Sequence, residues 1–500
     1  MNEIRVQHVL HAVAIAAMVL YGVAAYAAGG RTHCEMGRRA VNQYIGSDVE
    51  PMLPGLPGLF ATDDLRCAFY CGCSFPDWGY QGGFPDASEA SHWRPFQEAY
   101  VAVLRERFPR PWGDEAKQEI AFFLGAIEHG TTDVPWHFSY DDCVSFQDAV
   151  RREDGDADEC EPALDVHLYA TLPLDVNMVG RAFWPTDTIL YAFGRCGIAV
   201  PRDGLVKGCN LLQLAWNFGD PLGAVAELHY RNRYPWAKAH FIDYYYGGVE
   251  HCAAMTSVWI KYFYARLCGW HFYQNTQPSG WPPTDSYRPF LGVHDAHVCK
   301  AKPSANTGGE PLIHVGHTGE ADERIGLVRV DLDDIPPHTD IEKAMLWLYT
   351  ARSITPLATP LRVDAFRVEW PWAEGTGLSH PMHGTEGREA EPGDITWREL
   401  QDGDVPYDPK GPPLAQAAIH ADPRDGYWVS WDVTEAARDW IGNPEANFGV
   451  ALRAEPADGR ADAMCGFYSS QAFTCERAEA GRRYGCRVAW RPTLVIFPAE

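Results

Sequence analysis

The segment HGTTDVPWH, residues 129–137, places two histidines and one aspartate at intervals of four residues. At this spacing His129 and Asp133 lie on one face of a helix, and imidazole combined with carboxylate is a ligand set typical of zinc. Because Pro135 has no backbone N–H, we expect the helix to end near Asp133 and a new turn to direct His137 back toward the other two side chains. The segment therefore predicts either a metal site or the polar end of an ordinary helix.

The chain around this segment, from about residue 28 to residue 275, predicts an all-α domain. Asp114–His129 begins with acidic residues and then repeats apolar side chains at Ile120, Phe123, Leu124 and Ile127, which is helical spacing. Further helices are predicted at Gln213–Leu228 and Gly248–Leu267.

The second half of the chain predicts a β-sandwich. Residues 276–310 are rich in proline, glycine and serine without periodicity, so we interpret them as a linker. Beyond the linker, short alternating or β-branched runs recur at 326–332, 344–349, 361–368, 427–433, 448–452 and 493–497. Such runs, separated by turn residues, are typical of an all-β sandwich, which we place at residues 311–500.

The first residues have the pattern of a secretory signal peptide. One arginine precedes an apolar run from Val9 to Ala28, and the run contains the small-residue cleavage pattern Ala25-Tyr26-Ala27. A run of this length also suits a membrane anchor, but no stop-transfer cluster of lysine and arginine follows it. We therefore predict a signal peptide at residues 1–27, Ala28 as the first residue after cleavage, and a secreted protein.

The cysteine content indicates the compartment of the protein, and the net charge indicates which ligands it is expected to bind. Fourteen cysteines predict disulfide bonds in an oxidising compartment, and the spacing of Cys67, Cys71 and Cys73 leaves their pairing open. The formal net charge of −25 makes nucleic acid an unexpected partner, because nucleic-acid binding depends on clustered lysine and arginine.

Three upstream segments carry further candidate ligands: His33 in RTHCEMGRRA, Asp77 in SFPDWGY and His92 in ASEASHWRPF. Together with FPRPW, IAFFLGAIEHGTTDVPWH and YYYGGVEHCAAMTSVW, they resemble the zinc-dependent phospholipase C and nuclease superfamily, in particular its glycosylphosphatidylinositol-specific phospholipase D branch. The resemblance runs from about residue 31 to residue 267, in the family's order and near its spacing. It implies an all-helical domain that holds two or three zinc ions.

The resemblance assigns ligands position by position. Asp77, His92 and His129 would hold the first zinc ion. Asp133 would bridge this ion to another, and His137 would belong to the second ion.

The remaining assignments depend on residues elsewhere in the chain. His33 would hold the third zinc ion together with the amino terminus of Ala28. Glu161 is the candidate carboxylate of the second ion, but the family's histidine four residues earlier is Ala157 here, and His167 lies on the other side of the carboxylate. The second site is therefore expected to depart from the family pattern.

The implied reaction is hydrolysis of a phosphodiester in a phospholipid or glycosylphosphatidylinositol head group at a membrane surface. Zinc would lower the pKa of a bound water and neutralise charge on the phosphoryl group. Asp77 is the candidate catalytic residue, which would orient or deprotonate that water while also binding metal. Two alternatives remain open: a single-strand nuclease on the same fold, and a non-catalytic or weakly active surface-binding protein stabilised by zinc.

The C-terminal half resembles a bacterial module of the DNRLRE type, a jelly-roll-like β-sandwich. The resemblance rests on RIGLVRVDLDDIPPHTDIEKAMLWLY, WVSWDVTEAARDWIGNPEANFGVALR, FYSSQAF and RPTLVIF. Because some relatives of this module bind polysaccharide, a polysaccharide is a second expected partner. Trp428, Trp431 and Trp440 are candidates for stacking on sugars, although a tryptophan in such a pattern more often belongs to the core.

Overall fold

The computed structural model describes residues 29–139, 143–275, 292–319, 321–351, 357, 360–378, 387–402, 411–420, 426–455, 462–472 and 487–499. The predicted signal peptide and Ala28 lie outside the described residues. The chain divides into two compact units, and within the described residues the first ends at Cys268 and the second begins at Gly269. None of the described helices combines the length and the apolar character needed to cross a membrane.

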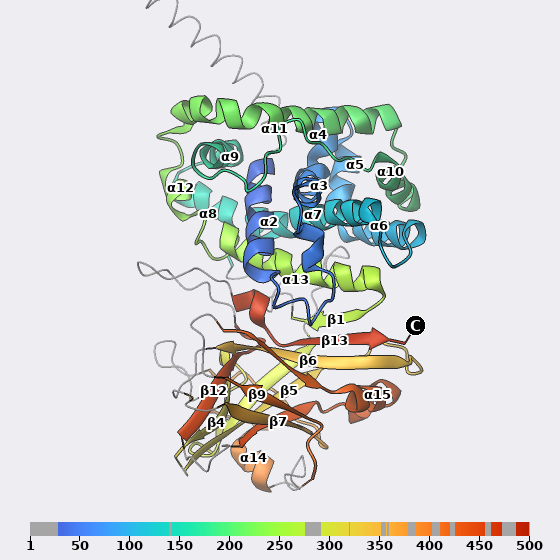
Figure 1. The fold of residues 1–500 in the computed structure, drawn as a ribbon. Helices are drawn as coiled ribbons and strands as arrows, with labels where there is room; N and C mark the ends of the chain where they lie inside the picture. Colours follow the sequence, from blue (N-terminus) through green and yellow to red (C-terminus); the bar gives the residue numbers. More distant parts are fainter. Residues whose placement is uncertain are drawn as a thin grey trace, which may run out of the picture. The chain divides into compact units, whose positions relative to one another are not determined.

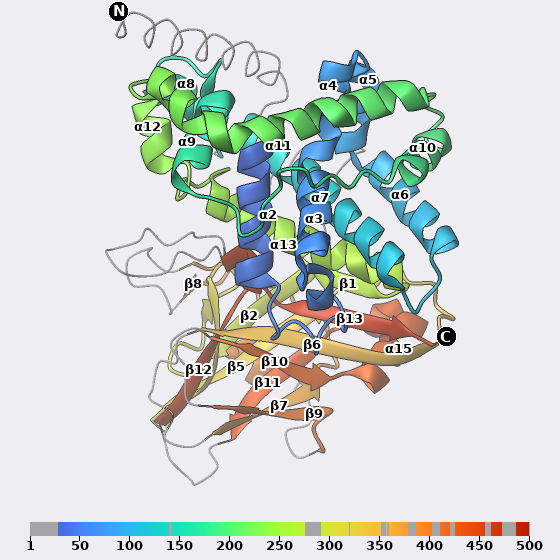
Figure 2. The same cartoon turned by 45° about the horizontal axis from the view of Figure 1, so that its top comes forward.

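The first unit, called the helical unit, confirms that the N-terminal part of the chain is all helical (Figures 1 and 2). Its α-helices are α2 (Gly30–Tyr44), α3 (Asp63–Ser74), α4 (Trp78–Gly82), α5 (Pro85–His92), α6 (Arg94–Arg107), α7 (Asp114–His137), α8 (Phe146–Glu153), α9 (Cys160–Thr171), α10 (Thr186–Arg195), α11 (Arg202–Tyr230), α12 (Pro235–His240) and α13 (Val249–Cys268). Two 3₁₀ helices, η1 (Pro57–Phe60) and η2 (Phe75–Asp77), flank α3.

Helix α7 does not end before Pro135 as predicted but continues through it to His137. The proline removes only one backbone N–H from the helix. Burial of the last turn outweighs this loss, because Trp136 is buried and its ring lies 4.4 Å from the ring of Phe146. The three ligand candidates of segment 129–137 therefore project from one uninterrupted helix, one turn apart.

Helices α3 and α7 pack with their backbones in direct contact. A Cβ atom at Gly72 of α3 would lie 1.9 Å from the carbonyl oxygen of Phe122, and a Cβ atom at Gly125 of α7 would lie 1.9 Å from the carbonyl oxygen of Phe69. Only glycine fits at both positions. This close approach brings the C-terminal end of α3 beside the histidine-bearing half of α7.

The contact predicts that Gly125→Ala destabilises the protein by about 1–3 kcal/mol or more, because the added methyl forces two helix backbones apart. Chemical denaturation monitored by circular dichroism measures this change. Gly194→Ala in α10 is the matched control, because nothing lies within 4 Å of the Cβ position at Gly194, and alanine is the better helix former there. Equal stability of the two variants would contradict the proposed contact.

The second unit, called the sheet unit, confirms that the C-terminal part of the chain is an antiparallel sheet region. Its strands are β1 (His271–Gln274), β2 (Val293–Cys299), β3 (Ala305–Asn306), β4 (Leu312–Thr318), β5 (Asp322–Val330), β6 (Ile341–Ala351), β7 (Leu361–Arg367), β8 (Arg388–Glu389), β9 (Ala415–Ile419), β10 (Trp428–Asp432), β11 (Val450–Glu455), β12 (Asp462–Tyr468) and β13 (Thr493–Pro498). The main sheet has the order β1-β13-β6-β12-β4-β5-β11-β7-β9, with β10 paired to β6 and β2 paired to β5. Two short α-helices, α14 (Trp397–Asp402) and α15 (Thr434–Gly442), and two 3₁₀ helices, η3 (Pro444–Ala446) and η4 (Arg487–Trp490), also belong to the unit.

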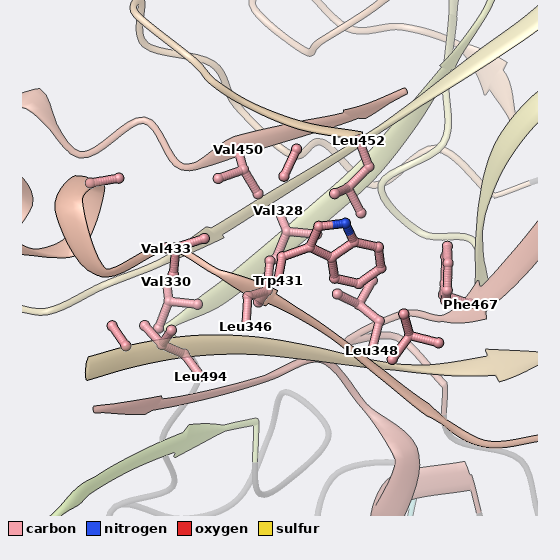
Figure 3. Packing of buried hydrophobic residues seen from close by; sticks show 14 of the residues in the cluster. Val328, Val330, Leu346, Leu348, Trp431, Val433, Val450, Leu452, Phe467 and Leu494 are labelled. Atoms are coloured by element: carbon pink, nitrogen blue, oxygen red, sulfur yellow. The ribbon is translucent and has the colours of Figure 1, made fainter. Parts of the chain in front are cut away.

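Tryptophan side chains fill the core of the sheet unit. Figure 3 shows the Trp431 ring among aliphatic side chains that include Leu348 and Leu452. Trp431 is 1% exposed and Trp440 is 5% exposed, so neither ring offers a face to a sugar. Trp428 is only half-buried. The burial of Trp431 and Trp440 therefore rules out sugar stacking on these two rings.

Part of the predicted linker, residues 276–310, belongs to the sheet unit. Strand β2 lies inside it and pairs along its length with β5, from Val293 opposite Val330 to Cys299 opposite Arg324. The sequence of β2, VHDAHVC, did not predict a strand because polar residues interrupt the alternation of apolar residues. Residues 276–291 lie outside the described residues.

The predicted disulfide bonds are absent from the part of the chain that the structure describes. Cys67, Cys71 and Cys73 lie on α3, whose geometry directs them to different neighbours, and the Cys67 sulfur accepts a hydrogen bond from Arg181 at 3.7 Å. Burial raises the pKa of the Cys71 thiol to about 12. These side chains are therefore buried thiols within the core.

Candidate metal centre

Four histidines of the helical unit, His33, His92, His129 and His137, each have Nδ1 in contact with a protein oxygen. The partners, in the same order, are Thr132 Oγ1 at 2.8 Å, the Ser88 carbonyl oxygen at 2.9 Å, the Cys73 carbonyl oxygen at 2.6 Å and Gln147 Oε1 at 3.2 Å. A carbonyl oxygen only accepts hydrogen bonds, so in the neutral rings of His92 and His129 the proton lies on Nδ1. Their Nε2 atoms are then the ligand atoms, an arrangement typical of histidines that bind metal.

The carboxylate of Asp133 lies among all four Nε2 atoms. Its Oδ2 is 3.3 Å from His92 Nε2 and 3.6 Å from His129 Nε2. Its Oδ1 is 3.2 Å from His33 Nε2 and 3.7 Å from His137 Nε2. The two oxygens thus face two different groups of imidazoles, which is the geometry of a bridging carboxylate.

Asp77, His92 and His129 form the first of two groups able to hold a metal ion. One ligand atom from each lies within 4.8 Å of the others, and all three side chains are buried. Asp77 Oδ1 lies 3.5 Å from His92 Nε2 and 3.6 Å from His129 Nε2. The three residues come from η2, the last residue of α5 and the middle of α7, so the contact of α7 with its neighbours assembles the group.

His33, His129 and Asp133 form the second group, whose ligand atoms also lie within 4.8 Å of one another. The rings of His33 and His129 stack with centroids 3.7 Å apart. His129 belongs to both groups, so the two candidate metal positions share a ligand as well as a carboxylate.

Opposite charges keep the carboxylates of Asp77 and Asp133 ionised. Burial favours the neutral form of Asp77, but His129 and His92 outweigh it and lower the pKa of Asp77 to about 2. Burial opposes the charged form of His92, yet Asp77 and Asp133 raise the pKa of His92 to about 9. The pKa of Asp133 is lowered even further, again against the effect of burial, by His129, His33 and His137. Such strong mutual dependence of buried groups is typical of functional sites.

His137 and Glu161 lie together at the edge of the cluster, with 3.1 Å between His137 Nε2 and Glu161 Oε1. The Glu161 Oε1 atom is buried and has no hydrogen bond in the described structure, which suits a ligand atom. Ala157, at the position where the resemblance led us to expect a histidine, is buried and adds no ligand. His167 does not replace it, because its ring contacts Phe241 and its Nδ1 faces Glu227 at 3.4 Å.

The first turn of α2 holds His33 in place. Ala28 lies outside the described residues, but Gly29 accepts a hydrogen bond from the His33 backbone N–H at 2.8 Å. Asp165, which sequence reasoning missed, accepts hydrogen bonds from the backbone N–H groups of Arg31 at 3.1 Å and Thr32 at 2.8 Å. Asp165 lies four residues after Glu161 on α9, and this helical spacing could have marked it as a second carboxylate on the same face.

Glu128 is a second residue that sequence reasoning missed. It is fully buried, its Oε1 accepts a hydrogen bond from Thr132 at 3.2 Å and lies 3.5 Å from His33 Nδ1, and its Oε2 has no hydrogen bond in the described structure. A carboxylate behind a metal-binding histidine orients the ring and strengthens it as a ligand. The signal in the sequence was a glutamate inside the apolar run IAFFLGAIEH.

Glu128→Gln should weaken binding of the metal ion nearest His33 by about 10- to 100-fold, because the amide keeps the shape but removes the charge behind the ring. Competition with a chelator of known affinity measures this change on the purified protein. Glu119→Gln is the matched control, a buried glutamate that hydrogen-bonds Thr188 away from the cluster. Unchanged affinity in Glu128→Gln would exclude this role.

Comparison with known proteins gives partial matches. The chain is 28% identical over 242 residues to the phosphatidylinositol-glycan-specific phospholipase D of Rattus norvegicus, a match that covers 45% of this chain and 27% of that protein. It is 28% identical over 203 residues to the Homo sapiens protein of the same name, covering 37% and 24%. With the Bos taurus protein it shares 28% over 245 residues, covering 45% and 28%.

The chain thus spans about a quarter of the length of the curated relatives it matches. No protein-family model matches the chain. The partial similarity indicates a relationship to a phospholipase family.

Proposed function

We propose that this protein is a secreted, zinc-dependent phosphodiesterase that hydrolyses the head-group phosphodiester of a phospholipid or of a glycosylphosphatidylinositol anchor. The observation that carries the proposal is the convergence of Asp77, His92, His129 and Asp133, with 3.3–3.6 Å between the imidazole Nε2 atoms and the carboxylate oxygens. Similarity to proteins named phosphatidylinositol-glycan-specific phospholipase D supports the substrate class.

Zinc is the metal that this donor set fits best. Zinc accepts imidazole nitrogen together with carboxylate oxygen, whereas magnesium and calcium prefer oxygen ligands. The protein oxygens that hold each Nδ1 support the same choice. Asp77, His92, His129 and Asp133 would hold one ion.

Two further zinc positions depend on less complete sets of residues. His33 and Asp133 would hold one of them, joined by the amine of Ala28 after cleavage of the signal peptide. His137 and Glu161 would hold the other with Asp133, which leaves that position without the histidine that Ala157 replaces.

Zinc bound at the cluster supplies a Lewis acid that lowers the pKa of water and offsets negative charge on the phosphoryl group. A pKa of about 2 keeps Asp77 ionised at neutral pH, so Asp77 would not act as an acid. A carboxylate with so low a pKa is also a weak base, so Asp77 would orient the attacking water more effectively than it would deprotonate it. The histidines, fixed through Nδ1, keep the geometry rigid during the reaction.

His129→Ala removes a residue shared by both metal groups, so we expect it to lose at least one zinc ion and to lower turnover by at least about 100-fold. Elemental analysis and product analysis on phosphatidylcholine and on a glycosylphosphatidylinositol-anchored protein, each with and without chelator, measure both effects. His240→Ala on α12 is the matched control, a histidine with a side-chain exposure of 46% whose ring faces Asp243. Full activity of His129→Ala, or turnover that resists the chelator, would refute the zinc mechanism.

A second candidate is a zinc-stabilised binding protein without turnover. The observation that favours it is Ala157, buried where the second metal position needs a ligand. In that case elemental analysis would find zinc while no lipid substrate is cleaved, and removal of zinc would lower the unfolding temperature.

A further inference from the structure

Exposed apolar side chains gather on one long helix of the helical unit. Among the described residues, nine large apolar side chains are exposed, and four of them lie on α11: Val206 (40% exposed), Leu214 (43%), Phe218 (42%) and Leu228 (63%). We call these four residues the α11 stripe. A helix turns by about 100° per residue, so the four side chains fall within an arc of about 120° and extend over about 33 Å. The exposed side chains of Lys207 and Asn210 fall within the same arc, so the four apolar side chains share one side of the helix with these two polar ones.

The charge of this face differs from that of the whole chain. Between Val206 and Leu228, the other exposed residues that the structure describes are Lys207 and Asn210, and no described carboxylate is exposed there. Glu227, near the end of the helix, is half-buried and pairs with Lys238 at 2.9 Å. In a chain with a formal net charge of −25, the described residues of this face expose one lysine and no carboxylate, which suits an apolar partner.

The α11 stripe lies on the helix that spans the two sides of the metal centre. At one end, α11 packs on α4, where the Cβ position of Gly208 contacts Trp78, the residue after Asp77. Toward the other end, Gly223 contacts Tyr169 of α9, the helix that carries Glu161. Figures 1 and 2 show α11 lying across the end of the helical unit at which α2, the helix of His33, begins.

Two further exposed apolar side chains lie outside this helix, one beside α11 and one next to a proposed ligand. Val179 is 46% exposed, and the neighbouring Gly180 N–H donates a hydrogen bond to Asn217 of α11 at 2.9 Å. Phe138, which directly follows His137, is 55% exposed. An enzyme whose substrate is anchored in a bilayer needs its apolar surface at the same end as its metal centre.

We propose that the α11 stripe inserts into the surface of a bilayer of zwitterionic phospholipid and so brings the metal centre to head groups in that bilayer. This inference rests on the proposed function for its lipid substrate. An amphipathic helix that lies in the interface buries its apolar face at the boundary between head groups and acyl chains. The net negative charge of the chain favours a zwitterionic surface over an anionic one.

The test compares the full-length wild-type protein with the double variant Leu214→Glu/Phe218→Glu. In co-sedimentation with phosphatidylcholine vesicles, the variant should bind at least tenfold more weakly, and its turnover of vesicle lipid should fall by a similar factor. Its turnover of a short-chain phosphatidylcholine below the micelle concentration should stay within twofold of wild type. Tyr191→Glu on α10, at a residue 63% exposed but outside the stripe, is the control and should bind vesicles like wild type.

The outcomes separate this inference from the proposed function. Equal vesicle binding by wild type and double variant would overturn the inference, and so would binding that requires phosphatidylserine in the vesicles. A wild-type dimer in light scattering that the double variant dissociates would assign the stripe to a second copy of the chain and would also overturn it. Failure of the wild type to hydrolyse either lipid form, with vesicle binding still lost in the variant, would refute the proposed function alone.

Discussion

The helical unit depends on the contacts between the Asp133 carboxylate and the Nε2 atoms of four histidines. The two oxygens of this carboxylate lie 3.2–3.7 Å from those nitrogens, so the carboxylate links residues of α2, α5 and α7. A buried carboxylate without partners would cost several kcal/mol. The surrounding imidazoles, each fixed through Nδ1, compensate for that cost only when all the helices are in place. The ionised state of Asp133 and the fold are therefore mutually dependent.

The packing of α3 against α7 makes this arrangement geometrically possible. The glycine contact at Gly72 and Gly125 brings the two backbones together, and the Cys73 carbonyl oxygen then accepts a hydrogen bond from His129 Nδ1 at 2.6 Å. Helix α7 contributes three residues to the cluster because it continues through Pro135. A break at the proline would separate His137 from the others. The continuation of α7 through Pro135 thus places His129, Asp133 and His137 on one helix.

Local spacing predicted much of this molecule, and contacts between distant segments account for the rest. The i, i+4 spacing of His129 and Asp133 and the apolar periodicity before it indicated the helix that carries them, and the runs after residue 311 indicated the strands. Pro135 was misinterpreted because a proline rule describes an isolated helix, whereas burial of Trp136 is a tertiary effect. Glu128 and Asp165 each have a local signal in the sequence, but their contacts with His33 and with the first turn of α2 join residues far apart in the chain, and local spacing does not predict such contacts. The disulfide prediction failed for the described cysteines because a count of cysteines contains no geometry.

We propose that the cluster around Asp133 is a metal centre. X-ray diffraction data collected on both sides of the zinc absorption edge, from crystals of the full chain grown with zinc, distinguish a bound zinc ion from an empty cluster. We expect an anomalous peak that lies among Asp77, His92, His129 and Asp133 and disappears below the edge. Crystals that contain zinc elsewhere but give no anomalous peak among these four side chains would contradict it.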